Sequence, residues 1–201
     1  MQLPKLGADR TFLLRKTGIG VLAGAAAIAT GALLLRKRHE SASGNPSVPD
    51  PIRRVDLARY MGRWYEYGRY EQRFEANCEN VTADYALRAD GLVNIINTCR
   101  DADGRVSRIA MGRAKPVDAS NPSKLKVSFL GPFYTGNYWI LDHADDYAWS
   151  IVGDPTGRFL WILGREPTPS PEIYAELVSH AQSMGFDMSM FRRTTQTANA
   201  T

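Results

Sequence analysis

The stretch GRWYE, Gly62 to Glu66, places a glycine two residues before a tryptophan at the point where a series of β-rich segments begins. Tryptophan has a large apolar surface that gains stability when it is buried. A glycine beside it allows the close backbone approach or sharp bend that a strand needs where it enters a curved sheet. We therefore expect Gly62 at the start of the first strand and Trp64 pointing inward, where it plugs one end of the domain.

Short β-rich segments separated by turn sequences continue to residue 165. In KLKVSFL, Leu125, Val127 and Phe129 point to one side and the residues between them to the other. Turn sequences such as ADG (89–91) and DADG (101–104) join neighbouring segments as hairpins do. Eight strands are predicted, at residues 62–70, 80–88, 92–99, 105–115, 124–130, 136–142, 147–153 and 158–165.

One helix follows the strands. Ser170 suits the N-cap, Pro171 the first helical position and Gly185 the exit. The apolar residues that recur at helical spacing should pack against the outside of the sheet; they are Ile173, Tyr174, Leu177, Val178, Ala181 and Met184. The predicted fold is all-β, an eight-stranded antiparallel up-and-down barrel with one C-terminal helix outside and room for one small ligand. Residues 190–195 are expected to add an edge strand.

The two cysteines, Cys78 and Cys99, flank a predicted hairpin that turns at Gly91. Folding the hairpin about its turn brings them within two residues of being cross-strand neighbours. A disulfide is therefore expected, with two buried thiols as the alternative. Because such bonds persist outside the cytosol, the domain is expected to face an oxidising compartment.

The first fifty residues carry 7 Lys/Arg against 3 Asp/Glu, whereas residues 51–201 carry 18 of each. Residues 17–35 contain no charge, and a helix of that length spans roughly 28 Å, enough for a bilayer core. We expect residues 1–39 to be a basic segment with a signal-anchor helix. The alternatives are a signal peptide cleaved after Ala27-Ile28-Ala29 and a buried or disordered segment. Residues 40–54, rich in Ser, Pro and Gly, are expected to form a flexible linker to a domain at 55–201.

Five stretches in this order resemble the lipocalin family, in particular the branch of the bacterial lipocalin (Blc) and apolipoprotein D. They are YMGRWYEYGRYEQRFE (60–75), VTADYALRADGLVNIIN (81–97), LKVSFLGPFYTGNYWILD (125–142), DYAWSIVG (146–153) and FLWILGREPT (159–168). The resemblance implies a cup-shaped barrel, open at one end, that carries fatty acids, lysophospholipids or similar amphiphiles at membranes. It also implies a structural signature of Gly62, Trp64 and Arg165 at the closed end, where strand parity lets Arg165 stack over the indole.

Strand parity also predicts which side chains face the cavity: Glu66, Tyr85, Asn97, Phe129 and Trp161. The resemblance adds Tyr134, which matches a residue at the mouth of the barrel. Apolar walls with few polar groups suit an acyl chain. Glu66 and Asn97 have an equally good alternative as buried polar groups that satisfy each other or bind water.

Other classes of protein find little support. His39, His143 and His180 are not spaced for zinc, and no nucleophile motif is present, so neither an enzyme, a cofactor nor a metal is expected. A lipid isomerase is the minor alternative, and His180 is expected to be a solvated helix residue. The electrically neutral domain argues against nucleic acid. An interaction module with an unoccupied barrel, and a homodimer, stay open.

The cell envelope is the expected location. LAGA (22–25) has the shape of a bacterial lipobox, but Ala25 stands where the lipidated cysteine would be needed. Membrane attachment therefore falls to residues 17–35, which predicts inner-membrane anchoring with the domain facing the periplasm. Secretion to the periplasm after cleavage is the alternative.

Overall fold

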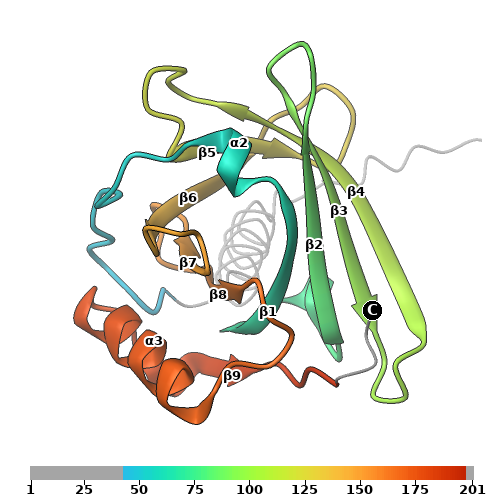
Figure 1. Ribbon diagram of the computed structural model, residues 1–201, viewed down its shortest axis with the longest axis vertical. Helices are drawn as coiled ribbons and strands as arrows, with labels where there is room; N and C mark the ends of the chain where they lie inside the picture. Colours follow the sequence, from blue (N-terminus) through green and yellow to red (C-terminus); the bar gives the residue numbers. More distant parts are fainter. Residues whose placement is uncertain (1–42, 198–201) are drawn as a thin grey trace, which may run out of the picture. The chain divides into compact units, whose positions relative to one another are not determined.

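The computed structural model describes residues 43–197, which form an antiparallel β-barrel (Figure 1). The strand order is β2-β3-β4-β5-β6-β7-β8-β1-β9, and a further pairing of β1 with β2 closes the ring of the first eight strands. Strands that follow each other in the sequence are neighbours in the sheet, as hairpin connections require. The predicted up-and-down barrel is confirmed.

The element bounds agree with the predicted series to within a few residues. The strands are β1 (Gly62–Tyr70), β2 (Glu79–Leu87), β3 (Val93–Arg100), β4 (Val106–Pro116), β5 (Lys124–Ser128), β6 (Gly136–His143), β7 (Trp149–Gly153), β8 (Leu160–Gly164) and β9 (Phe191–Arg193). The helices are α2 (Leu57–Tyr60) and α3 (Pro171–Ser183), with 3-10 turns η1 (Arg73–Glu75) and η2 (Met188–Met190). Three strands are shorter than predicted, namely β5, β7 and β8.

Two of these differences have local causes. Strand β5 ends at Ser128 because the Ser128 hydroxyl donates to the Gly131 carbonyl oxygen (2.9 Å) and fixes a turn, so Phe129 lies in the loop. Strand β7 begins only at Trp149, since Tyr147 has a φ of 64° and left-handed backbone cannot continue a strand.

Helix α3 lies outside the barrel beside β9 (Figure 1). The Ser170 hydroxyl accepts from the Ile173 amide, as the N-cap prediction requires, and Leu177 and Ala181 are buried against the sheet. Two predictions for this helix are wrong. Ile173 is exposed, because in the first turn it is Tyr174 that packs on the apolar layer. His180 is only partly solvated, because its Nε2 lies 2.8 Å from an Asp142 carboxylate oxygen.

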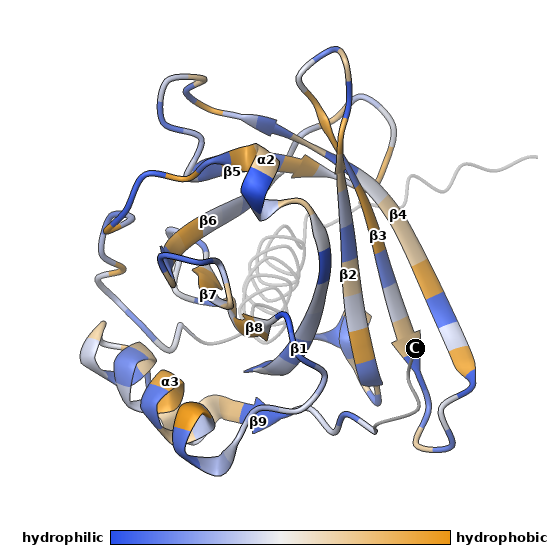
Figure 2. Cartoon of the chain, in the orientation of Figure 1, coloured by the Kyte–Doolittle hydropathy of each residue, from blue (hydrophilic) through white to orange (hydrophobic). Residues whose placement is uncertain are grey.

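Among the described residues, buried apolar side chains form two large layers and one small cluster around the disulfide. One layer fills the interior of the barrel and includes Trp64, Tyr85, Ile140 and Leu163. The other layer lies between the outer surface of β6–β8 and helix α3 and includes Leu177. The alternation of apolar and polar residues along the strands is visible in Figure 2. Several strands are therefore buried on both sides, which explains why their sequences are more apolar than a half-exposed strand requires.

The predicted flexible linker, residues 40–54, is wrong for residues 43–54, which pack on the barrel. The Gly44 amide donates to Gly157 O (2.9 Å), and the Ile52 amide donates to Leu141 O (2.8 Å). Asn45 is buried, and its side-chain amide donates to Met184 O (3.0 Å). The serine, proline and glycine residues of this segment allow the chain to bend where it packs on the barrel surface.

The basic segment at 1–39, with the signal-anchor predicted at 17–35, lies outside the described residues. Within residues 43–197 no helix combines the length and apolarity needed to cross a membrane.

The predicted disulfide between Cys78 and Cys99 is present. The two residues are 21 positions apart and join the start of β2 to the end of β3. Their loop encloses the whole hairpin, so the bond restricts the unfolded chain as well as holding the strand ends together.

Replacing both cysteines by serine should lower the free energy of unfolding by about 3 kcal/mol, because a loop of this size loses that much closure entropy when cross-linked. Urea unfolding of the wild type and of the Cys78→Ser/Cys99→Ser variant measures the difference. Equal midpoints would show that the bond does not stabilise the domain.

Candidate ligand-binding site

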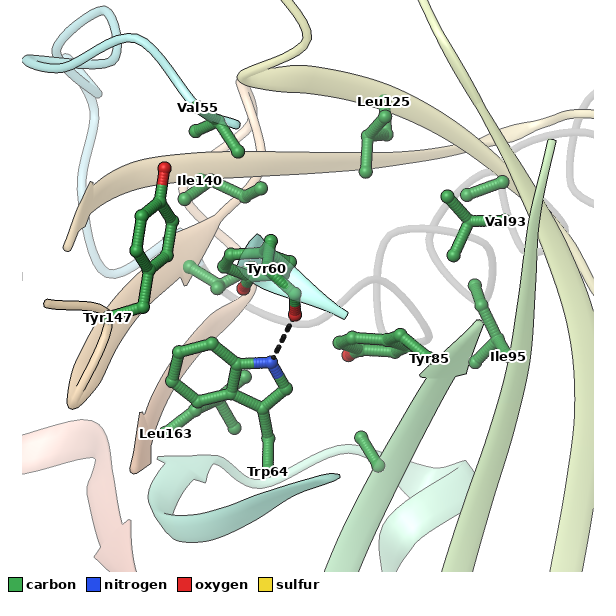
Figure 3. Close-up of a cluster of buried hydrophobic side chains, with 13 residues drawn as sticks. Val55, Tyr60, Trp64, Tyr85, Val93, Ile95, Leu125, Ile140, Tyr147 and Leu163 are labelled. Carbon is green, nitrogen blue, oxygen red and sulfur yellow. Dashed lines mark hydrogen bonds between the residues drawn. The ribbon is translucent and has the colours of Figure 1, made fainter. Parts of the chain in front are cut away.

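The barrel end at which β1 begins is filled by Trp64, whose side chain is fully buried (Figure 3). Its indole N–H donates to Tyr60 O (2.9 Å), which fixes the ring against helix α2. The Arg165 guanidinium carbon lies 3.8 Å from the centre of the indole ring, within cation–π range. This end is called the closed end below.

Arg165 also holds the backbone that leads into the barrel. Its two terminal nitrogens donate to four carbonyl oxygens, those of Arg59, Tyr60, Met61 and Arg63, at 2.7–3.1 Å. The planar guanidinium can reach four acceptors and stack on a ring at once, which the ammonium of a lysine cannot do.

Gly62 is required by its backbone conformation. Its φ is 96°, a region that residues with a Cβ rarely occupy. A Cβ placed there would also lie 3.3 Å from a terminal nitrogen of Arg165. The glycine thus lets the chain turn into β1 directly beneath the arginine, two residues before Trp64.

Three tyrosine hydroxyls meet above the indole, an arrangement that the sequence analysis missed. The Tyr138 hydroxyl lies 2.9 Å from that of Tyr60 and 3.1 Å from that of Tyr85, and Tyr60 also contacts the Ser150 hydroxyl at 3.2 Å. Burial raises the pKa of Tyr60 to about 12 and raises the pKa values of Tyr85 and Tyr138 further. All three therefore stay neutral phenols that donate and accept hydrogen bonds inside an apolar wall.

The space beside these tyrosines is small. A cavity of about 10 Å³, room for one water molecule, lies between side chains of α2 and β2 to β6. Its lining residues are Tyr60, Met61, Tyr85, Val93, Ile95, Ala114, Leu125, Val127 and Tyr138. A larger hollow, about 170 Å³, lies outside the barrel between α3, β9 and residues 167–169. We assign the ligand site to the barrel because apolar side chains and tyrosines line the inner cavity, whereas the lining of the outer hollow includes polar residues such as Arg193, Thr194 and Gln196.

Small side chains line one wall above this cavity. On β4, residues Ala110, Gly112 and Ala114 alternate on the side that faces the interior, and Ala114 is fully buried. Asn97 on β3 pairs with Ala110, and its buried side-chain oxygen has no hydrogen-bond partner in the part of the chain that the structure describes. The wall thus combines slender side chains with one free acceptor.

A charged cluster lies where β1 separates from β2. The Arg69 guanidinium is fully buried and contacts the Glu66 carboxylate at 2.6 Å, and it also donates to the Thr194 hydroxyl at 3.1 Å. Burial would lower the pKa of Arg69, but the carboxylates of Glu66, Glu75 and Glu71 outweigh it and raise that pKa. The arginine therefore stays charged.

Glu75, on the turn η1, connects this cluster to the predicted cavity residue Trp161. One Glu75 carboxylate oxygen accepts from the Trp161 indole N–H (3.1 Å) and lies 3.8 Å from Arg69 Nε. Burial raises the pKa of Glu75 to about 8, assisted by the charge of Glu66 and opposed by Arg69. The alternation of inward and outward residues along a strand could not predict Glu75, because Glu75 lies in a connection between two strands.

The structure brings only some of the six predicted ligand residues together. Tyr85 lies in the interior with Tyr138, and Trp161 packs partly against the same apolar cluster. Glu66 is satisfied by Arg69 and Thr194, so the suggested pairing with Asn97 is wrong.

The remaining two residues lie in the β5–β6 loop. Phe129 is about half exposed, and its ring covers Gly112 so closely that a Cβ there would lie 2.7 Å from it. The Tyr134 ring lies 4.7 Å from the Lys115 ammonium. Since Lys115 alternates with the buried Ala114, Tyr134 lies at the outer surface of the barrel.

Among residues 43–197, no group of three or more His, Cys, Asp or Glu side chains is arranged to hold a metal ion. The site offers apolar surface, phenol hydroxyls and a buried carboxyl. These groups suit the binding of an amphiphile by contact and hydrogen bonding.

A closed eight-stranded antiparallel barrel with an external helix and an arginine-capped tryptophan defines the class of small-ligand-binding calyx proteins. Residues 55–196 match the family model of the lipocalin-like domain. The chain belongs to the lipocalin family, in the branch of Blc and apolipoprotein D.

Individual relatives agree with this assignment. Outer membrane lipoprotein Blc of Escherichia coli K12 is 41% identical over 151 residues, which cover 72% of this chain and 85% of that one. Apolipoprotein D of Mus musculus is 33% identical over 162 residues, covering 76% and 83%. The solved structure of insecticyanin from the tobacco hornworm superposes with a TM-score of 0.60 at 17% identity, covering 79% of this chain and 90% of that one.

Replacing Arg165 by methionine should lower the free energy of unfolding by roughly 2–4 kcal/mol, because four carbonyl oxygens lose their donor and the indole loses its cation. Lysine at this position should restore only part of that loss. The matched control is Arg88→Met, which removes a solvent-exposed ion pair with Asp90 and should cost much less stability than Arg165→Met. Equal losses in Arg165→Met and Arg88→Met would contradict the assigned role.

Glu75 should make the fold less stable as pH rises. Its pKa is about 8 in the folded state against an ordinary value of 4.5, so the folded state keeps a proton that the unfolded state releases. The stability of the wild type relative to Glu75→Gln should therefore be greatest below pH 4.5 and fall until about pH 8. Thermal unfolding across this range measures it, with the more exposed Glu71→Gln as control. A difference that is constant with pH would refute the shift.

Proposed function

We propose that the chain binds a single-chain amphiphile, a fatty acid or lysophospholipid, inside its barrel and stores or transports it at the bacterial cell envelope. The observation that carries this proposal is the row of slender residues on β4, Ala110, Gly112 and Ala114, which faces an apolar interior. Such a wall gives an acyl chain contact along its length once the Phe129 ring, which lies over Gly112, moves aside, and each buried methylene contributes roughly 0.8 kcal/mol.

The ligand contacts that we propose lie along the interior. Tyr85 and Trp161 supply aromatic surface, and the unpaired oxygen of Asn97 can accept a hydrogen bond from a head group or from water. Because the closed end has room for only one water molecule, the acyl chain would enter beside Ala110 and require side chains above the tyrosines to move. Binding by contact without catalysis is in keeping with the relatives, which are lipocalins.

A second function is favoured by that same small cavity. A barrel that stays filled by its own side chains would act as an interaction module that presents its outer surface to another envelope protein. The two functions differ in whether the purified chain takes up an amphiphile at all.

For location, we propose that residues 1–39 anchor the domain at 55–201 to the inner membrane, with the domain in the periplasm. The support is the uncharged run at 17–35 and the disulfide, which suits an oxidising compartment. Relatives in four bacterial sources are named outer membrane lipoproteins, which agrees with an envelope location in general.

Ala110→Phe should weaken binding of a fluorescent fatty acid roughly tenfold, because the ring displaces about two methylenes from the wall. Ala86→Phe is the matched control, since Ala86 is exposed on β2, and it should bind as the wild type does. Titration followed by the quenching of tryptophan fluorescence gives both affinities. Equal affinities in the two variants would contradict binding at the β4 wall, and no binding by the wild type would favour the interaction module.

A further inference from the structure

Exposed apolar side chains are concentrated on one part of the barrel. Among the described residues, twelve large hydrophobic side chains are exposed, and eight of them fall between residues 96 and 133. Ile109 and Met111 alternate with the inward-facing Ala110 and Gly112 of β4, so they point away from the barrel. Met111 is 71% exposed. An exposed apolar group of this kind marks an interaction surface in a soluble domain.

The β5–β6 loop adds to the same outer surface. Contact of the Tyr134 ring with Lys115, an outward-facing residue of β4, brings the loop onto the outside of that strand. The loop carries Leu130 and Phe133, which are 82% and 70% exposed. Strand β4 lies on the side of the barrel away from α3 (Figure 1). The exposed apolar side chains of β4, Ile109 and Met111, and those of the loop, Leu130 and Phe133, thus form one surface.

Positive charge is concentrated in the same segment. Residues 104–137 carry six Lys/Arg and one Asp, whereas the other residues of 43–197 carry 12 Lys/Arg and 18 Asp/Glu. Within the described chain, neither Arg113 nor Lys115 has a carboxylate at ion-pair distance. These two cations are therefore available to an external anion.

We propose that this β4 face, consisting of Ile109, Met111, Arg113, Lys115, Leu130 and Phe133, docks on a bilayer that contains anionic phospholipids. Apolar tips that enter the acyl boundary and cations that contact the phosphates are the combination that holds a domain at an anionic membrane. A second copy of the chain fits less well, because a two-fold contact would bring the same cations together. Strand addition is blocked at residues 113–116 of β4, which already pair with β5; residues 106–112 pair with β3 alone.

The test uses the full chain and places an environment-sensitive dye at one position in each variant. Met111→Cys is labelled with a polarity-sensitive dye; the introduced thiol is the only free one, because both native cysteines form the disulfide. The chain is added to phosphatidylcholine vesicles with and without phosphatidylglycerol. We expect a blue shift of the dye only with phosphatidylglycerol, and its loss in high salt. The same dye on Ile173→Cys, an exposed apolar residue of α3, should stay in water.

Charge-reversal variants test whether Arg113 and Lys115 are the cations that contact the bilayer. Arg113→Glu with Lys115→Glu, in the labelled Met111→Cys chain, should abolish the shift, whereas Arg193→Glu on β9 should leave it. Circular dichroism confirms that each variant is folded. A dye at position 111 that stays aqueous while the chain is bound to vesicles would overturn the proposal, because attachment would then come from another segment. A shift that is independent of phosphatidylglycerol, or equal at position 173, would overturn it as well. Fatty-acid titration of the same variants keeps this result separate from the ligand proposal.

Discussion

The contact between Arg165 and Trp64 determines where the barrel ends. An eight-stranded barrel is wide enough to leave an open core, so one end has to be filled if the interior is to exclude water. Here the fully buried indole does this, and the guanidinium covers its face while it holds four backbone carbonyls of the entering chain. Gly62 makes the approach possible. The tyrosine hydroxyls and the small cavity beside them depend on this geometry.

The side chains in the barrel interior change in size and polarity from the closed end to the opposite end. Near Trp64 the side chains are large and almost fill the barrel, whereas along β4 they shrink to alanine and glycine. Beyond them lies the cluster around Arg69, where Glu75 is buried beside Trp161. An amphiphile fits this arrangement, because its acyl chain is stabilised by apolar contacts and its head group by hydrogen bonds to polar groups. This gradient is the physical basis of the proposed lipid binding.

Much of the fold follows from the sequence, because local patterns specify it. Alternation predicts the strands, the spacing of turns predicts the hairpins, and the position of Cys78 and Cys99 about their turn predicts the disulfide. The stacking of Arg165 on Trp64 also follows, since parity places both at the closed end.

The site is less predictable from the sequence, because the alternation of inward and outward residues applies only within a strand. Tyr60 enters the interior from the short helix α2, and Glu75 enters from the turn η1. The resemblance places Tyr134 at the mouth, but a turn at Ser128 ends β5 before it and the loop carries Tyr134 to the outer surface. Phe129 also lies beyond the strand, yet its ring covers the inward-facing Gly112. The partner of Glu66 lies three residues away across a β-bulge in β1, which no periodic pattern reveals.

Native mass spectrometry of the purified full chain shows whether the barrel binds one single-chain amphiphile. We expect an added mass equal to one such molecule per chain, which organic solvent removes and added lysophospholipid restores. A chain that carries no added mass, either as purified or after incubation with fatty acid or lysophospholipid, would contradict the proposed binding.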